Sequence, residues 1–223
     1  MGVDVDRLVA IHPQLYHMAE DGSWPSIARF GLLSTSALLD LFEISGDDRI
    51  RIESTHRPNS IRLSHPIYGE VVIRDQAPMD DAGLQRALTG TGLEPRDWYL
   101  LLNRRVFFWL TEERLARMLS AGNYRARPHL VLTIDTRELV DRHWNRISLS
   151  PINTGATKPM PAPRGPGTFQ SPNEYPFAEL RRRRRVKDVI VELAVDYAVR
   201  DITDLVVERR RMVDGTVLSR EAQ

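Results

Sequence analysis

The chain has 223 residues, of which 42% are hydrophobic and 27% are charged, proportions typical of one globular domain spanning residues 1–223. Its net charge is only +1, and it contains no cysteine, which excludes disulfides, thiolate metal sites and a cysteine nucleophile. No apolar run approaches the ~18 residues of a membrane-spanning helix, and the N-terminus lacks the apolar core of a signal peptide. We therefore expect a cytoplasmic protein that does not enter a membrane.

The first informative stretch is a strand, a short helix and a turn. Apolar neighbours alternate with His17 over residues 15–18, which predicts a strand that turns the histidine away from them. Ser23 stands where an N-cap belongs, Pro25 fits a first helical turn, and Gly31 is a natural stop. Such a unit can fold a ligand between His17 and the returning backbone. The alternative is a core histidine with satisfied hydrogen bonds.

Periodicity assigns most of the remaining chain. Helices are predicted at residues 1–12, 36–42, 80–88, 95–102 and 136–141, with a further one capped by Thr111. Strands are predicted at residues 61–63, 70–74, 106–110, 129–135, 147–150, 188–195 and 202–207. The polar segment 45–59 has no clear assignment, but Pro58 disfavours helix at Arg57, which we expect on an extended, exposed backbone. Arg74-Asp75-Gln76 is interpreted as a turn rather than a site.

Two of these strands carry features of a site. Residues 106–110 are apolar and aromatic throughout, as in a central strand that is buried on both faces. Residues 188–195 hold a single carboxylate, Glu192, among apolar side chains. A lone carboxylate in a buried strand is costly, so Glu192 must lie on a solvent face or line a cleft.

A long loop precedes the Glu192 strand. Residues 151–180 form a loop rich in proline and glycine. Half of the chain's 14 prolines fall between 151 and 176, and this composition excludes regular elements between those two residues. A loop of this length is usually functional or disordered, and its aromatic residues favour function. The run Arg181 to Arg185 follows, either as the solvated edge of a strand or as a surface that attracts phosphates.

Several short motifs occur together in an order that resembles the ADP-ribosyltransferase superfamily, and most closely its DarT-type branch, which modifies DNA bases. The motifs are Leu15-Tyr16-His17, Trp24-Pro25-Ser26-Ile27, Gly31-Leu32-Leu33-Ser34, the aromatic strand from Val106 to Trp109, and Glu192-Leu193-Ala194-Val195. They cover both ends of the chain, while residues 45–92 match loosely. The resemblance implies an α+β fold with a split, mostly antiparallel β-sheet and peripheral short helices.

The resemblance also implies a reaction. Superfamily members cleave the nicotinamide–ribose bond of NAD through an oxocarbenium-like transition state and transfer ADP-ribose to an acceptor, with NAD as substrate and no metal. Glu192 matches the catalytic glutamate, and Arg57 is the candidate for a catalytic or diphosphate-binding arginine. The residues expected to contact NAD are His17, its neighbour Tyr16, Ser34, and Phe107 or Phe108 as a stacking surface for nicotinamide.

The loop lies where the superfamily recognises its acceptor. The residues expected to face the acceptor are Asn153, Thr154, Arg164, Phe169, Asn173 and Tyr175. The sequence leaves the acceptor open, with DNA and RNA among the candidates, and it allows a neutralising partner of the antitoxin type. The alternative functions are an NAD glycohydrolase, with water as acceptor, and a non-catalytic module that binds nucleotides or nucleic acid. The six histidines lack metal-ligand spacing, and no phosphate-binding glycine loop occurs.

Overall fold

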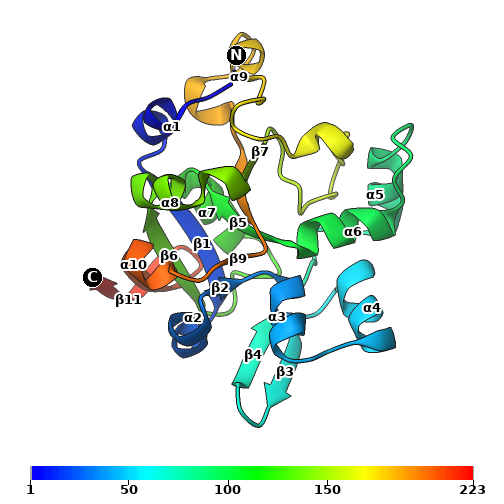
Figure 1. Ribbon diagram of the computed structural model, residues 1–223, viewed down its shortest axis with the longest axis vertical. Coiled ribbons are helices and arrows are strands. Elements are labelled where there is room, and N and C mark those ends of the chain that lie inside the picture. Colours follow the sequence, from blue (N-terminus) through cyan, green and yellow to red (C-terminus); the bar gives the residue numbers. More distant parts are fainter. Residues whose placement is uncertain (1, 223) are drawn as a thin grey trace.

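A computed structural model describes residues 2–222 of the chain as an α+β fold around a seven-stranded sheet (Figure 1). Every pair of neighbouring strands in this sheet is antiparallel, and the strand order is β11-β10-β6-β1-β5-β8-β7. In chain order the strands of this sheet are β1 (Gln14–Glu20), β5 (Arg105–Trp109), β6 (His129–Asp135), β7 (Ile147–Ser150), β8 (Glu192–Asp196), β10 (Val206–Val213) and β11 (Thr216–Ala222). The expected α+β class with a large antiparallel sheet is confirmed.

Short helices cover both faces of the sheet. The main core lies between the sheet and the helices α1 (Val5–Ile11), α2 (Trp24–Phe30), α8 (Thr136–His143), α9 (Phe177–Arg181) and α10 (Ile202–Leu205). The opposite face is covered by α7 (Glu112–Leu119), whose Leu115 and Leu119 are fully buried against Val131 of β6. Alternation of side chains along each strand supplies apolar residues to both faces.

A second group of elements lies beside this sheet (Figure 1). It contains α3 (Thr35–Leu41), α4 (Gly46–Ser54) and a hairpin of β3 (Ile61–His65) and β4 (Gly69–Ile73), which share one apolar cluster. Next to it, α5 (Asp81–Ala87) and α6 (Pro95–Asn103) pack around Trp98. The two-residue strands β2 (Leu32–Leu33) and β9 (Ala198–Val199) pair with each other and tie this group to the end of β8.

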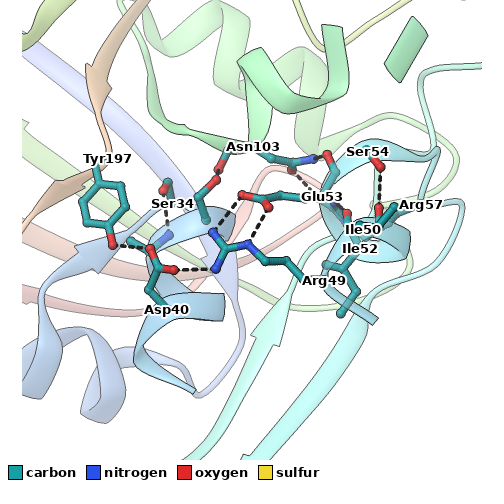
Figure 2. Close-up of polar contacts among 12 residues, drawn as sticks. Ser34, Asp40, Arg49, Ile50, Ile52, Glu53, Ser54, Arg57, Asn103 and Tyr197 are labelled. Carbon is teal, nitrogen blue, oxygen red and sulfur yellow. Dashed lines mark hydrogen bonds and ion pairs between the residues drawn. The ribbon is translucent and has the colours of Figure 1, made fainter. Parts of the chain in front are cut away.

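Polar contacts strengthen that junction (Figure 2). Asp40 of α3 accepts a hydrogen bond from the hydroxyl of Tyr197, which directly follows β8, and forms an ion pair with Arg49 of α4, both at 2.5 Å. Arg49 also pairs with Glu53 on the same helix. The α3–α4 group is therefore held in a fixed position relative to the strand that carries Glu192.

The sheet has an opening between β1 and β5. β1 pairs with β6 at seven positions, from Gln14 to Glu20, but with β5 at the single position Tyr16–Trp109. In a regular ladder the pairing would continue toward Glu20 and Arg105, and it does not. The two strands therefore part beyond Tyr16.

Most predicted elements occur where the sequence places them, and three expectations are wrong. Residues 202–207 form α10 and the start of β10 rather than one strand, and the hairpin β10–β11 was not predicted. Residues 188–191 lie outside a strand, so that Glu192 begins β8. β5 alternates between buried and half-buried side chains instead of being buried on both faces. Within the described chain, no helix is both long and apolar enough to cross a membrane.

Candidate functional site

A cavity of about 350 Å³ opens where β1 and β5 part. That volume is in the usual range for a small-molecule site. Its lining comes from β1, from the segment between α2 and α3, from β4 and the residues after it, from β5, from the start of the proline-rich loop, and from the first residue of β8. The cavity therefore collects residues from both ends of the chain.

His17 presents one open acceptor to this cavity. Its Nδ1 lies 2.8 Å from the carbonyl oxygen of Phe107, and because a carbonyl can only accept, Nδ1 must carry the proton. Burial lowers the pKa of His17 to about 4, so the ring is neutral at pH 7. Nε2 is then unprotonated and can accept a hydrogen bond, but none of residues 2–222 donates one to it. His17 lines the cavity with half of its hydrogen-bonding capacity unused, unlike a satisfied core histidine.

Glu192 reaches the same cavity from the first position of β8. The side chain is 6% exposed, and its Oε2 accepts hydrogen bonds from the backbone N–H of Thr154 at 3.1 Å and from the Thr154 hydroxyl at 2.6 Å. Burial raises the pKa of Glu192 to about 7, against the opposing effect of the Thr154 bonds. Oε1 accepts no hydrogen bond from the described residues. Glu192 therefore lines a cleft, and does not lie on a solvent face.

The two candidate stacking residues lie on opposite faces of β5. Phe107 lines the cavity, whereas Phe108 is 1% exposed and packs in the main core. Tyr16 also lies away from the cavity lining, in the cluster under α7. Ser34 lines the cavity, and its hydroxyl caps α3 by accepting from the Ala37 N–H at 3.2 Å. Phe107 and Ser34 thus line the cavity, whereas Tyr16 and Phe108 do not.

Arg57 is 6% exposed, so the prediction of an exposed position is wrong. The residue does lie outside the helices, as Pro58 requires, but its guanidinium turns inward at the cavity. It donates to the carbonyl oxygen of Ile52 at 2.6 Å and to Oδ1 of Asn103 at 3.0 Å (Figure 2). It also donates to the carbonyl oxygen of Arg74 at 3.3 Å. No carboxylate contacts it within the described chain, and burial lowers the pKa of Arg57 to about 10.

The segment Arg74-Asp75-Gln76, which we interpreted as a turn in preference to a site, also lines the cavity. Asp75 accepts hydrogen bonds from the Tyr124 hydroxyl at 2.6 Å and from Arg127 at 2.9 Å. Arg74 lies 3.7 Å from Glu20 at the end of β1. The available signal was three polar residues directly after an apolar strand, the usual position of site residues at strand ends.

The loop residues separate into two groups. Asn153 and Thr154 line the cavity. Arg164 and Tyr175 are 4% and 0% exposed, so the expectation that they face an acceptor is wrong. Tyr175 donates its hydroxyl proton to the carbonyl of Val189.

The remaining loop residues are also outside the cavity lining. Phe169 stacks on Trp98, with ring centroids 5.7 Å apart, and lies 6.0 Å from the Phe107 ring, so it supports the stacking surface from behind. Asn173 is exposed. Arg184 of the basic run donates to the carbonyl of Pro151 at 2.6 Å, at the start of the loop. The run begins at the last residue of α9 and is not a strand edge.

No group of three or more His, Cys, Asp or Glu residues within residues 2–222 has an arrangement that could hold a metal ion. A family of unknown function, designated DUF7002, matches residues 13–206, and the chain therefore belongs to this family. None of the curated proteins matches the chain. The match includes His17, Arg57 and Glu192 and ends where the β10–β11 hairpin begins.

Proposed function

We propose that this protein is an NAD-dependent mono-ADP-ribosyltransferase with an ADP-ribosyltransferase-like fold. The observation that carries the proposal is that His17 and Glu192, residues from opposite ends of the chain, both line one cavity. Each offers an acceptor atom without a hydrogen bond from the described residues, Nε2 and Oε1 respectively. Two acceptors at one cavity suit a ligand that carries hydroxyl donors, such as the diol of a ribose.

The charge of Glu192 suits cleavage of the nicotinamide–ribose bond. When that bond breaks, nicotinamide leaves with the bonding electron pair and positive charge develops on the ribose ring. A fixed carboxylate stabilises this charge, and in a site shielded from water that term is usually the largest. The acceptor then bonds to the anomeric carbon and releases its proton. With a pKa near 7, Glu192 is about half ionised at neutral pH before the cationic nicotinamide enters and favours its charged form.

Two arginines support the binding of a diphosphate. Arg57 and Arg105 both line the cavity without a carboxylate in contact among the described residues. A buried guanidinium without a counter-ion favours an anionic ligand. Phe107, with the Phe169 ring behind it, offers an aromatic surface for the flat nicotinamide ring.

A nucleic-acid base is the acceptor that we favour. Four of the five arginines from Arg181 to Arg185 are exposed, and Arg184 connects the run to Pro151, two residues before Asn153 at the cavity. Five cations near the cavity would attract a phosphate backbone and make binding dependent on salt.

The test is to incubate the protein with NAD labelled in its adenylate half, together with DNA, RNA or protein. Label attached to nucleic acid supports the full proposal, and label attached to protein corrects the acceptor alone. Release of free ADP-ribose without transfer identifies an NAD glycohydrolase. If NAD remains intact with every acceptor, the enzymatic proposal is wrong and a non-catalytic binding module takes its place.

A further inference from the structure

The proline-rich loop has a fixed inner part and an exposed outer part. Thr154, Thr157 and Arg164 are all at most 4% exposed, whereas Met160 between them is 84% exposed. The inner part lies against the cavity, because Asn153, Thr154 and Gly155 line it. A loop that only recognised an acceptor would not need to bury polar side chains beside the cavity.

Thr154 uses all of its polar groups at once. Its N–H and its hydroxyl both donate to Oε2 of Glu192, at 3.1 and 2.6 Å. Its carbonyl accepts from Nη1 of Arg164 at 2.8 Å and from the indole N–H of Trp98 at 3.3 Å. The Thr154 peptide is therefore held from one side by Arg164 and Trp98 while it holds Glu192 on the other.

The guanidinium of Arg164 donates only to backbone carbonyl oxygens, and no carboxylate among the described residues contacts it. Its other donors go to the carbonyl oxygens of Ala156 at 2.7 Å and Ala162 at 3.1 Å, and its guanidinium lies 5.5 Å from the Trp98 ring centre. Burial lowers the pKa of Arg164, and the nearby charge of Glu192 partly opposes this shift. The charged groups that act on Glu192 are Arg164 from the loop and Arg114 from α7, and both favour the carboxylate.

We propose that Thr154 is a positioning residue for Glu192 and that Arg164 and Trp98 hold Thr154 in place. Tying Oε2 to Thr154 fixes the carboxylate plane and leaves Oε1 directed to the ligand. The inner part of the loop then prepares the carboxylate for the reaction, while acceptor contacts fall to Asn153 and the exposed part. This inference deepens the proposed function and rests on it, but its first test needs neither NAD nor an acceptor.

That test is a carbon-13 NMR titration of the glutamate side chains, in which the Glu192 signal is identified by its absence from the Glu192→Gln protein. A hydrogen bond to a charged group is worth enough to move a titration by about one pH unit or more. In Thr154→Val, which retains shape but loses the hydroxyl, the Glu192 midpoint should rise by at least about one pH unit. Thr154→Ser should restore it.

Thr157→Val is the matched control. Thr157 is a second buried threonine of the same loop, and its hydroxyl contacts Asp80 instead of Glu192. This variant should leave the Glu192 midpoint unchanged. If Thr154→Val does not fold, Thr154→Ala takes its place. A Glu192 midpoint that is the same in wild type and in the variant lacking the Thr154 hydroxyl overturns the inference.

NAD turnover forms the second arm. With the inference correct, Thr154→Val should lower kcat about tenfold or more at pH 7 with little change in KM, and should move the acidic limb of the pH profile toward higher pH. A shifted titration with no NAD turnover in wild type would retain the positioning role and reject the proposed function. NAD turnover in wild type together with an unshifted Glu192 titration in Thr154→Val would retain the proposed function and reject the positioning role of Thr154.

Discussion

The two sides of the cavity recognise different chemistry. The strands β1 and β8 present His17 and Glu192, each with an acceptor atom that no described residue occupies. The segment from α4 to β4 presents Arg57, a cation whose contacts are carbonyl and amide oxygens. One side therefore favours hydroxyl donors and developing positive charge, and the other favours an anion. The proposed ligand, NAD, carries a ribose for the first side and a diphosphate for the second.

The largest expected effect is a difference in stability between substitutions on the two faces of β5. Phe108→Ala should destabilise the fold by about 3–5 kcal/mol, because it empties a site in the main core. Phe107→Ala should cost clearly less stability but weaken NAD binding about tenfold through loss of stacking. Urea unfolding and calorimetric titration measure the two quantities. Equal stability losses for both variants would contradict the assignment of Phe107 to the cavity.

The carboxylate of Glu192 should be the group that most affects the rate of NAD cleavage. Glu192→Gln preserves shape but removes the charge, and NAD cleavage should fall on the order of 10²-fold or more. Asp196→Asn makes the same change at the other end of β8, where Asp196 pairs with Arg104 outside the cavity lining. Its rate should stay within about twofold of wild type. Initial rates of nicotinamide release provide the comparison. Equal losses of rate in both variants would contradict the proposed role of Glu192.

The same substitution should stabilise the ligand-free protein above neutral pH. Since the fold raises the pKa of Glu192 from 4.5 to about 7, the folded state holds a proton that the unfolded state releases between these values. Stability from this group is therefore lost as pH rises, and Glu192→Gln should gain roughly 2–3 kcal/mol at pH 8 and nothing near pH 4. Denaturant unfolding at both pH values checks the sign. A gain that is equal at pH 4 and pH 8 contradicts it.

The smallest expected effect concerns the cationic side. Arg57→Lys keeps the charge but cannot reproduce three hydrogen bonds in the geometry of a guanidinium, so ADP-ribose should bind about tenfold more weakly. Nicotinamide, which lacks phosphate, should bind as before. Arg127→Lys, at the far side of Asp75 and outside the cavity lining, is the control and should leave both affinities unchanged. A matching loss for nicotinamide would exclude a diphosphate role.

Local rules predicted the strand side well and the other side poorly. The strand at His17, the proline in the first turn of α2 and the stop at Gly31 depend on neighbours within a few residues, and they fold as expected. Glu192 stood out because one acid among apolar residues requires a special environment. By contrast, the position of Arg57 depends on Asn103 and Arg74, which are distant in sequence. The backbone preference that Pro58 imposes on Arg57 does not predict these distant contacts.

The loop shows the same limit. Its lack of long regular elements follows from its prolines, but the burial of Arg164 and Tyr175 depends on carbonyl oxygens that the fold brings to them. Residues 202–207 are apolar enough for a strand or a helix, and packing against the main core decides for α10 over most of the segment. Patterns in one sequence predict the elements, and contacts between distant segments decide which polar side chains reach the cavity.

The most direct test of the account is a crystal structure of the Glu192→Gln protein with NAD, in which slow turnover keeps the dinucleotide intact. The account predicts the nicotinamide-side ribose between His17 and residue 192, with a hydroxyl within hydrogen-bonding distance of Nε2 of His17 and the diphosphate toward Arg57. NAD bound elsewhere, or with its adenosine half between these two residues, would contradict it.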